Sequence, residues 1–237
     1  MESYTITELR RELHTRADPQ QAADLQRYFK TAPGEYGEND RFLGIRVPEL
    51  RRLAKEYRPL ALDAVVESLR SQWHEERCLA LLLLVAQYQK GSAETRDSIH
   101  GIYLENTRFV NNWDLVDVSA EHIVGAHTDP NDVSLLVRLG GSDCVWERRI
   151  AIMATLHWIK RNEFAPTLRI ADLLLQDTHD LIQKAVGWML REVGKRDQVQ
   201  QEAFLITRYR RMPRTMLRYA IERLPEARRQ QFLRGEA

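Results

Sequence analysis

One short stretch of the chain carries a tryptophan and an aspartate at a spacing that could bind a cation. Trp113 and Asp117 lie four residues apart in a segment with a helical pattern, so both side chains face the same way. An indole face and a carboxylate both attract positive charge. A lone helical tryptophan more often belongs to a core, whereas an aspartate among apolar helical residues needs a partner.

Two later segments offer groups that could complete such a site. They are Trp146-Glu147-Arg148-Arg149 and the run from Gln183 to Arg191, which contains Trp188. If the three segments are equivalent helices of a repeat array, they line one face. Trp113, Arg149 and Trp188 then converge.

The elements that hold these residues are expected to be helices. The chain has 237 residues, is 43% hydrophobic and 29% charged, and contains only 11 Gly and 8 Pro, a composition typical of a mostly helical protein. Asp18-Pro19 and Asp129-Pro130 each place a capping residue before a proline suited to the first helical position. The expected helices span 5–16, 19–31, 48–58, 60–72, 75–90, 94–105, 113–126, 131–139, 145–161, 165–176, 179–195, 198–211 and 214–233, the last broken at Pro225.

A weak internal repeat predicts how these helices stack. Similar short strings, each a polar pair before small or apolar residues, begin at Arg77, Arg148 and Gln183, separated by 71 and 35 residues. One and two periods of about 35 residues fit a helical-hairpin repeat. The spacing predicts an all-α, curved α-solenoid, although on its own an irregular helical bundle fits equally well. No Pro/Gly/Ser-rich linker divides the chain, which indicates one domain over 1–237.

One long irregular connection interrupts the helical pattern. Thr31 to Arg41 contains one proline and two glycines, which end the preceding helix and prevent an immediate restart. Loops of this length are often functional, although an exposed insertion without a role fits equally well.

Charge is unevenly distributed along the chain. The net charge is only +1, but residues 204–234 hold nine arginines against two glutamates. Arginine suits bidentate phosphate contacts, so this segment is either a phosphate-binding track or a solvated helical tail.

Several functional classes have no support in the sequence. There is no P-loop, no GxGxxG and no HExxH pair, so we expect no cofactor and no metal. The longest apolar stretch, Leu79 to Ala86, is too short to span a bilayer, and no basic region followed by an apolar run begins the chain. We expect a cytoplasmic monomer without membrane contact, with Cys78 and Cys144 buried as free thiols and most histidines at the surface or capping helices.

The chain resembles the AlkD-like DNA alkylation repair glycosylases, which are built from HEAT-like antiparallel helical repeats. The resemblance covers nearly the whole chain, and its WDxVD and QKAxGWxLRE strings are the most specific. The matching segments are Arg27 to Lys30, Phe42 to Pro48, Trp113 to Asp117, Trp146 to Ile152 and Ile182 to Glu192.

The resemblance implies roles for the residues at its central motif. The family's catalytic carboxylate corresponds to Asp117, and the tryptophan four residues before it corresponds to Trp113. The functional arginine corresponds to Arg149, or to Arg148 if the register shifts by one.

It also implies a set of contacts to DNA and to the lesion. The second lesion-cradling tryptophan corresponds to Trp188, with Lys184 and Arg191 in the same string, and a DNA-contacting tyrosine corresponds to Tyr28. The loop after Tyr28 is longer than in the members of the family on which this match rests.

The function implied is a monofunctional DNA-alkylpurine glycosylase acting on duplex DNA. Its substrates are purines alkylated at N3 or N7, whose positive charge makes them good leaving groups, so one carboxylate stabilising the oxocarbenium-like sugar suffices. Two alternatives stay open: a noncatalytic relative that binds DNA structure, and a helical-repeat adaptor for a protein partner.

Overall fold

Helices form the regular structure of the described part of the chain, residues 4–237 of a computed structural model. Within that range the only strand-like pairings are two isolated bridges, Arg41 with Trp73 and Asp129 with Asp132. The residues divide by their contacts into two compact units, one ending at Ile123 and the other Val124–Ala237. The all-α prediction is confirmed, and the expectation of one domain over 1–237 stays a prediction.

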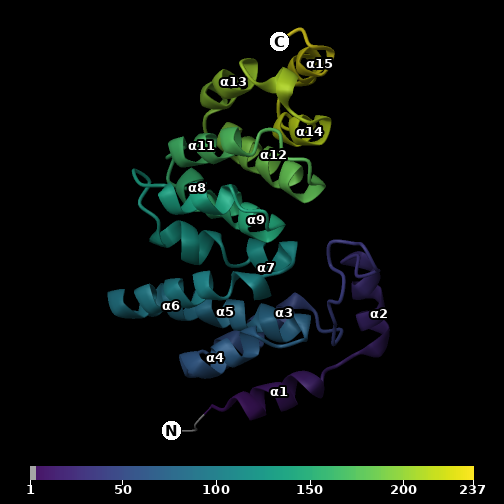
Figure 1. Cartoon of the computed structure of the whole chain (residues 1–237), viewed down its shortest axis with the longest axis vertical. Coiled ribbons are helices and arrows are strands. Elements are labelled where there is room, and N and C mark those ends of the chain that lie inside the picture. Colours follow the sequence, from purple (N-terminus) through teal and green to yellow (C-terminus); the bar gives the residue numbers. More distant parts are fainter. Residues whose placement is uncertain (1–3) are drawn as a thin grey trace. The chain divides into compact units, whose positions relative to one another are not determined.

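The first unit is organised around one long buried helix, α5. It packs against α3, α4, α6 and α7, while α1 packs against α4 (Figure 1). The elements are α1 (Ile6–His14), α2 (Pro19–Tyr28), α3 (Val47–Glu56), α4 (Leu62–Leu69), α5 (His74–Lys90), α6 (Ala93–Glu105), the 3-10 turn η1 (Thr107–Phe109) and α7 (Trp113–Asp117).

The second unit is a stack of helical hairpins. Helices α9, α12 and α14 pack in succession (Figure 1). Helices α8 and α11 pack on each other and both pack on α9, and α11 also packs on α12. The elements are α8 (Ser134–Gly140), α9 (Val145–Ala154), α10 (Leu156–Ile159), α11 (Ala165–Leu173), α12 (Asp180–Gly194), α13 (Gln198–Ile206), η3 (Tyr209–Arg211), α14 (Arg214–Ala220) and α15 (Glu226–Arg234).

The expected helix starts are mostly confirmed by their capping contacts. The Asp18 side chain accepts hydrogen bonds from the Gln20 and Gln21 amides, with Pro19 at the first helical position. The helix expected over 131–139 starts later, at Ser134, because Asp129 accepts from the Asn131 amide and forms a turn instead. The helix expected over 113–126 ends at Asp117 and is followed by a π-helical turn, η2 (Glu121–Gly125).

The three repeat strings occupy equivalent places in the structure. Each begins near the start of a helix, α5, α9 or α12, and its first side chain donates to the backbone carbonyl six residues earlier. The donor–acceptor pairs are Arg77 to Ser71, Arg148 to Ser142 and Gln183 to Asp177, each at 3.0 Å. This shared contact confirms that the spacing of 71 and 35 residues marks repeated helices.

A buried carboxylate, that of Glu75, fixes the backbone of the Phe42 to Pro48 segment. Glu75 accepts hydrogen bonds from the backbone amides of Leu43, Gly44 and Ile45 at 2.8 to 3.2 Å. Gly44 has φ +89°, and a Cβ there would lie 2.1 Å from the Asp18 carbonyl oxygen. The motif therefore needs glycine at this position, because both the conformation and the close approach exclude a side chain.

A second glycine of the matched motifs sits at a helix crossing. A Cβ on Gly187 of α12 would lie 2.5 Å from the Met216 carbonyl oxygen of α14 and 2.5 Å from Tyr219 Cβ. The glycine lets these two helices approach closely, which explains the GW pair in the QKAxGWxLRE string.

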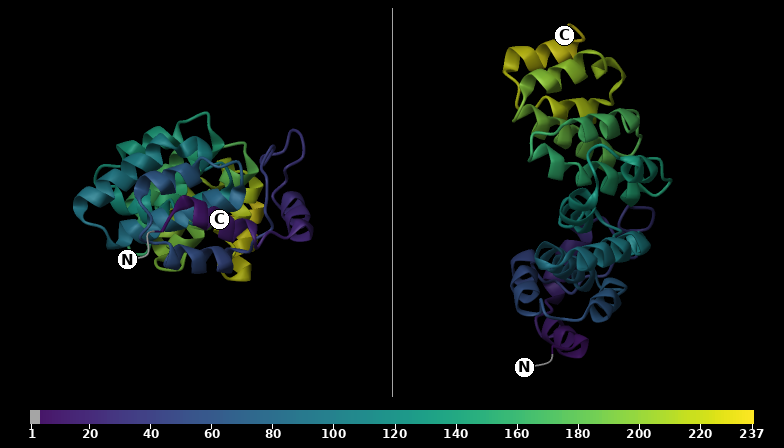
Figure 2. Two further views of the ribbon diagram at one scale, coloured as in Figure 1. Left: turned by 90° about the horizontal axis from the view of Figure 1, so that it is seen from below. Right: turned by 90° about the vertical axis from the view of Figure 1, so that its left-hand side faces the viewer.

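Helix α2 stands apart from the rest of the first unit. None of its residues is buried, and it lies to one side of α3 and α5 in Figure 1 and in the left-hand view of Figure 2. The next residue, Phe29, is buried and ties the end of α2 to the body of the unit.

The two cysteines differ in their surroundings. Cys78 is buried within α5, as expected, but Cys144 is exposed at the start of α9, so the expectation that both are buried is wrong. Cys144 is the N-cap residue of α9, and this position places its side chain outside the helix packing.

Candidate active site

The WDxVD string forms the short helix α7. Asn112 caps it, is fully buried, and accepts the Trp113 amide at 2.9 Å. Leu115 and Val116 point into the core, whereas Trp113 and Asp117 are partly exposed. The helix therefore leaves both the indole and the carboxylate partly accessible, and the two side chains line different cavities.

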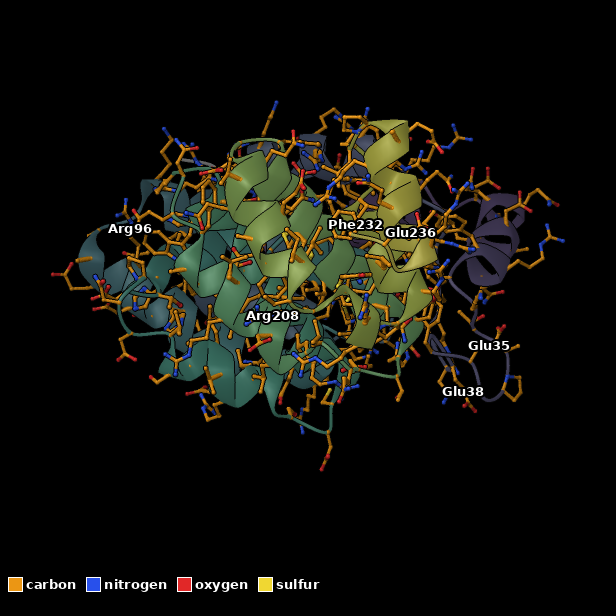
Figure 3. The ribbon with its side chains drawn as sticks, turned by 90° about the horizontal axis from the view of Figure 1, so that it is seen from above. Glu35, Glu38, Arg96, Arg208, Phe232 and Glu236 are labelled. Carbon is orange, nitrogen blue, oxygen red and sulfur yellow. The ribbon has the colours of Figure 1, made fainter. Side chains whose placement is uncertain are left out.

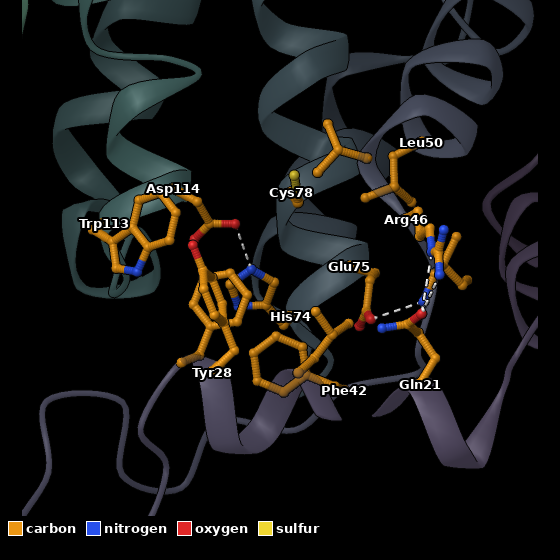
Figure 4. Close-up of a pocket in the computed structure, with 14 residues that line it drawn as sticks. Gln21, Tyr28, Phe42, Arg46, Leu50, His74, Glu75, Cys78, Trp113 and Asp114 are labelled. Carbon is orange, nitrogen blue, oxygen red and sulfur yellow. Dashed lines mark hydrogen bonds and ion pairs between the residues drawn. The ribbon is translucent and has the colours of Figure 1, made fainter. Parts of the chain in front are cut away.

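The other aspartate of the string, Asp114, belongs to a buried charge network. Its Oδ2 lies 2.9 Å from Nε2 of His74 (Figure 4). The other ring nitrogen, Nδ1, lies 2.7 Å from Oδ2 of Asp40. Asp40 also accepts from Arg77 at 2.6 Å. His74 is 3% exposed, so the expectation of surface or capping histidines fails for this residue.

Electrostatics make this histidine a cation. Burial alone would lower the pKa of His74, but the charges of Asp114 and Asp40 and the hydrogen bonds to them raise it to about 9. Burial would raise the pKa of Asp40, yet His74 and Arg77 outweigh it and lower that pKa to about 2. Two carboxylates and two cations thus offset one another inside the first unit.

Aromatic rings cover the network. Phe42 stacks on the His74 ring with 4.5 Å between centroids, and Phe29 stacks on Trp113 at 5.3 Å. Tyr28 meets Trp113 edge-on at 6.1 Å and is 64% exposed. The structure therefore brings together Tyr28 and Trp113, two of the residues singled out in the sequence.

A cavity of about 450 Å³ lies beside these rings (Figure 4). Helix α2 supplies Gln21, Leu25 and Tyr28 to its wall, and α7 supplies Trp113 and Asp114. Most of the lining is aromatic or aliphatic, so this cavity is a continuation of the ring cluster.

Asp117 faces a different cavity, of about 460 Å³. Its wall includes Arg51 and Lys55, both exposed and one turn apart on α3, and His122 beyond α7. The apolar floor comes from α5. A carboxylate beside two flexible cations suits the sugar and phosphates of a nucleotide, because the cations attract phosphate while the carboxylate faces positive charge on the sugar.

Arg51 and Lys55 were missed by the sequence reasoning. They follow directly after the Phe42 to Pro48 segment and are spaced four residues apart on an amphipathic helix. That spacing was the available signal, but nothing in the sequence shows that this face of α3 meets Asp117.

In the second unit, both candidate arginines bind the protein itself. Arg148 Nε lies 2.7 Å from Asp177 Oδ2, and its NH1 donates to the Ser142 carbonyl. Arg149 is 5% exposed and donates to the Leu181 carbonyl at 2.7 Å. Arg148 makes the repeat contact described above. The phosphate contact expected of Arg149 stays a prediction.

The remaining candidates lie along one side of α12. Lys184, Trp188 and Arg191 follow one another at helical spacing and are all partly exposed. Trp188 Nε1 donates to Glu192 at 3.0 Å, and Lys184 pairs with Asp180 at 2.6 Å. Arg191 pairs with Glu192 and Glu222. Each of the three side chains thus meets a carboxylate of the protein, and their contact with DNA stays a prediction.

The arginines near the end of the chain are partly engaged within the second unit. Arg208, labelled in Figure 3, pairs with Asp172 at 2.6 Å and stacks on Phe204, and Arg228 pairs with Glu202 at 2.7 Å. Exposed arginines on this segment are Arg210 and Arg214, which donate to the Gly235 and Leu233 carbonyls, and Arg211, Arg218, Arg223 and Arg234. The phosphate track expected from the sequence stays a prediction.

Residues 4–237 contain neither a metal-binding cluster of side chains nor a helix that could span a membrane. No group of three or more His, Cys, Asp or Glu side chains there is arranged to hold a metal ion. None of the helices in that range has the length and apolar character needed to cross a membrane.

Comparison with known proteins assigns the family. The sequence model of the family described as "DNA alkylation repair enzyme" matches residues 9–224. The chain belongs to the DNA alkylation repair enzyme family. The match spans both units and includes Tyr28, Trp113, Asp117, Arg148, Arg149, Lys184, Trp188 and Arg191.

Solved structures of the DNA alkylation repair family share this fold. A predicted DNA alkylation repair enzyme from Enterococcus faecalis superimposes with a TM-score of 0.68 at 20% identity, covering 89% of this chain and 97% of that one. AlkD2 from Streptococcus mutans gives 0.57 at 16% identity, covering 86% and 97%. No curated protein sequence matches this chain.

Proposed function

We propose that this protein is a DNA glycosylase that excises purines carrying a positive charge from alkylation at N3 or N7. The observation that carries the proposal is the pairing, on α7, of a partly exposed indole with a carboxylate that faces the Arg51 and Lys55 cavity. Membership of the DNA alkylation repair enzyme family supports it.

The chemistry follows from charge. The cationic purine is already an activated leaving group, so cleavage of the glycosidic bond moves positive charge onto the deoxyribose. Asp117 stabilises that charge and orients the attacking water, while Trp113 offers its ring face to the lesion. Arg51 and Lys55 hold phosphates beside the damaged nucleotide.

The size of the effect limits the substrate range. One carboxylate about 4 Å from a unit positive charge contributes about 4 kcal/mol at an effective dielectric constant of about 20. That energy corresponds to about three decades in rate. It suffices for a labile cationic adduct but not for a neutral purine, which also needs its leaving group protonated.

The test compares base release by the native protein and by Asp117→Asn from duplex DNA containing 7-methylguanine or 3-methyladenine, at saturating protein. We expect the variant to bind DNA normally and to release base about a thousandfold more slowly. Asp63→Asn, at an exposed position in the first turn of α4, removes the same charge and should match the native rate.

Two outcomes contradict the proposal. Release of neutral hypoxanthine as fast as 7-methylguanine would show that substrate charge is not used. Tight, salt-sensitive DNA binding without release of either alkylated base would identify a noncatalytic member of the family.

The phosphate contacts have a separate readout. In the double variant Arg51→Ala, Lys55→Ala, we expect DNA affinity to fall and the slope of log affinity against log salt to decrease by about 2, since about one counterion is released per phosphate contact. An unchanged slope would remove these two residues from the DNA interface.

A further inference from the structure

The irregular connection between α2 and α3 carries an aspartate, Asp40, that accepts hydrogen bonds from four donors. Asp40 is 6% exposed. Its Oδ1 accepts from Arg77 and from the Arg41 backbone amide, and its Oδ2 accepts from His74 and, at 3.2 Å, from the Asn112 side-chain amide. A single loop carboxylate thus joins the start of α5 to the residue that caps α7.

Two routes lead from Asp40 to the first turn of α7. The direct route runs through Asn112, whose amide group binds Asp40 and whose oxygen accepts the Trp113 amide. The second runs through His74 to Asp114. Because α7 has only five residues, its own hydrogen bonds cannot fix its direction, and tertiary contacts must do so.

Both ring nitrogens of His74 are used. Each lies within hydrogen-bond distance of a carboxylate oxygen, 2.7 Å to Asp40 and 2.9 Å to Asp114. Carboxylates only accept, so both nitrogens donate, which requires the imidazolium form. Loss of one proton would remove one of the two bonds and break the second route.

The ring cluster supports the same arrangement. Phe42 covers one face of His74, and Phe29 contacts both His74, at 5.0 Å, and Trp113. A shift of the histidine would therefore be transmitted to the indole through Phe29.

We propose that Asp40 and His74 are positioning residues that hold α7 so that Trp113 and Asp117 face DNA. This proposal rests on the function proposed above for those two residues, and it gives the 31–41 loop a role that the sequence left open.

The charged and titratable groups around His74 are few. The loop supplies Asp40 and α7 supplies Asp114. Helix α5 supplies Arg77, which is bound to Asp40, Glu75, whose oxygens accept three backbone amides, and the buried thiol of Cys78. The cavity beside His74 is also lined by Tyr28, at the end of α2, and by Arg46, which precedes α3 and donates to Gln21. Only His74 in this set has its pKa raised to about 9, so it is the group whose titration between pH 7 and 10 would loosen α7.

The experiment follows Trp113 directly. The full chain is labelled with 5-fluorotryptophan, the Trp113 ¹⁹F resonance is assigned with Trp113→Phe, and the spectrum is recorded from pH 6 to 11. We expect the Trp113 resonance to shift with a midpoint near 9 in the native protein and to be shifted, without that midpoint, in His74→Asn.

The chain offers a matched control. His14 also pairs with a carboxylate of α5, Glu76, at 3.2 Å, and its ring also lies against a tryptophan, Trp73, but it does not contact α7. His14→Asn should leave the Trp113 resonance and its titration unchanged.

The same variants are then compared in single-turnover release of 7-methylguanine. Misplacing a reacting group by about 1 Å costs up to about a hundredfold in rate, so we expect His74→Asn to slow release by about ten- to a hundredfold. Its DNA affinity should change less than about threefold, and His14→Asn should match the native protein.

The outcomes separate the two proposals. A Trp113 resonance that does not titrate near pH 9 in the native protein overturns the positioning role without any variant having to fold. So does a His74→Asn variant with a native spectrum or a native rate. If the native protein releases no base while Trp113 titrates as expected, the glycosylase proposal fails and the control of α7 by His74 stands.

Discussion

The same repeat contact occurs at the start of α5 and at the start of α9, but the aspartate that completes it comes from a different part of the chain in each case. Arg77 and Arg148 both bind the carbonyl six residues earlier and both meet an aspartate. Asp177, the partner of Arg148, precedes α12 in the second unit, so the contact joins two repeats. Asp40, the partner of Arg77, comes from outside the repeats and also binds His74.

The contact at α9 holds neighbouring repeats together, whereas the contact at α5 also connects to the candidate site. In the second unit the arginine and aspartate only continue the stack. In the first unit the aspartate that meets the arginine comes from a loop, and His74 connects it to Asp114 of α7, the helix that carries Trp113. The contact in the first unit therefore differs from that in the second by one loop carboxylate and one histidine.

The largest expected effect distinguishes the two aspartates. Asp40→Asn leaves the buried Arg77 without its charge partner and leaves His74 with Asp114 alone, and breaking a buried pair costs about 3 to 5 kcal/mol of unfolding free energy. Asp177→Asn removes the partner of Arg148, which is more exposed at 18%, and should cost about 2 kcal/mol. Urea denaturation followed by circular dichroism measures both, and equal costs would mean that the loop aspartate is no more than another repeat contact.

The next effect concerns two histidines with opposite pH responses. The pKa of His74 is raised from 6.5 to about 9, so its stabilisation is complete below about pH 6.5 and is lost as pH rises through 9. The shift corresponds to about 3 kcal/mol. Burial, with a contribution from Arg148, lowers the pKa of His179, so its stabilisation is present above pH 6.5 and is lost as pH falls through the lowered value.

The measurement is the unfolding free energy of His74→Asn and of His179→Asn relative to the native protein, from pH 5 to pH 10. The penalty for His74→Asn should shrink toward alkaline pH, and the penalty for His179→Asn should shrink toward acid pH. A His74→Asn penalty independent of pH would show that this histidine is neutral in the folded protein.

The smallest effect compares two helical glycines. Gly187→Ala forces a methyl group against the Met216 carbonyl and should cost about 1 to 3 kcal/mol. Gly101→Ala on α6 meets nothing within 4 Å and should stabilise the protein by about 0.5 to 1 kcal/mol. Thermal unfolding of the two single variants checks both signs, and a neutral Gly187→Ala would mean that α12 and α14 separate without cost.

The sequence predicted the local structure well because its signals are local. Asp18 caps α2 through bonds that reach only three residues along the chain, and the strings at Arg77, Arg148 and Gln183 mark equivalent helices by their spacing. The error at Asp129 has the same origin, since an aspartate before a proline caps a helix or closes a turn, and only the following residues determine which.

Only those residues of the candidate site that lie in a recognisable sequence motif could be predicted. Trp113 and Asp117 were found by their spacing and by resemblance. Asp40 and His74 are 34 residues apart and lie in a loop and a helix whose packing no local pattern describes. Their pairing depends on the path that the chain takes between them, which sequence periodicity does not contain.

The exposed thiol of Cys144, at the start of α9, allows the native protein to be labelled at one site for single-molecule measurements. The chain has two cysteines, and burial raises the pKa of Cys78 and keeps it from reagents. A maleimide dye would therefore attach to Cys144 of the native protein without any engineered substitution. Its fluorescence could then follow one molecule as it scans DNA.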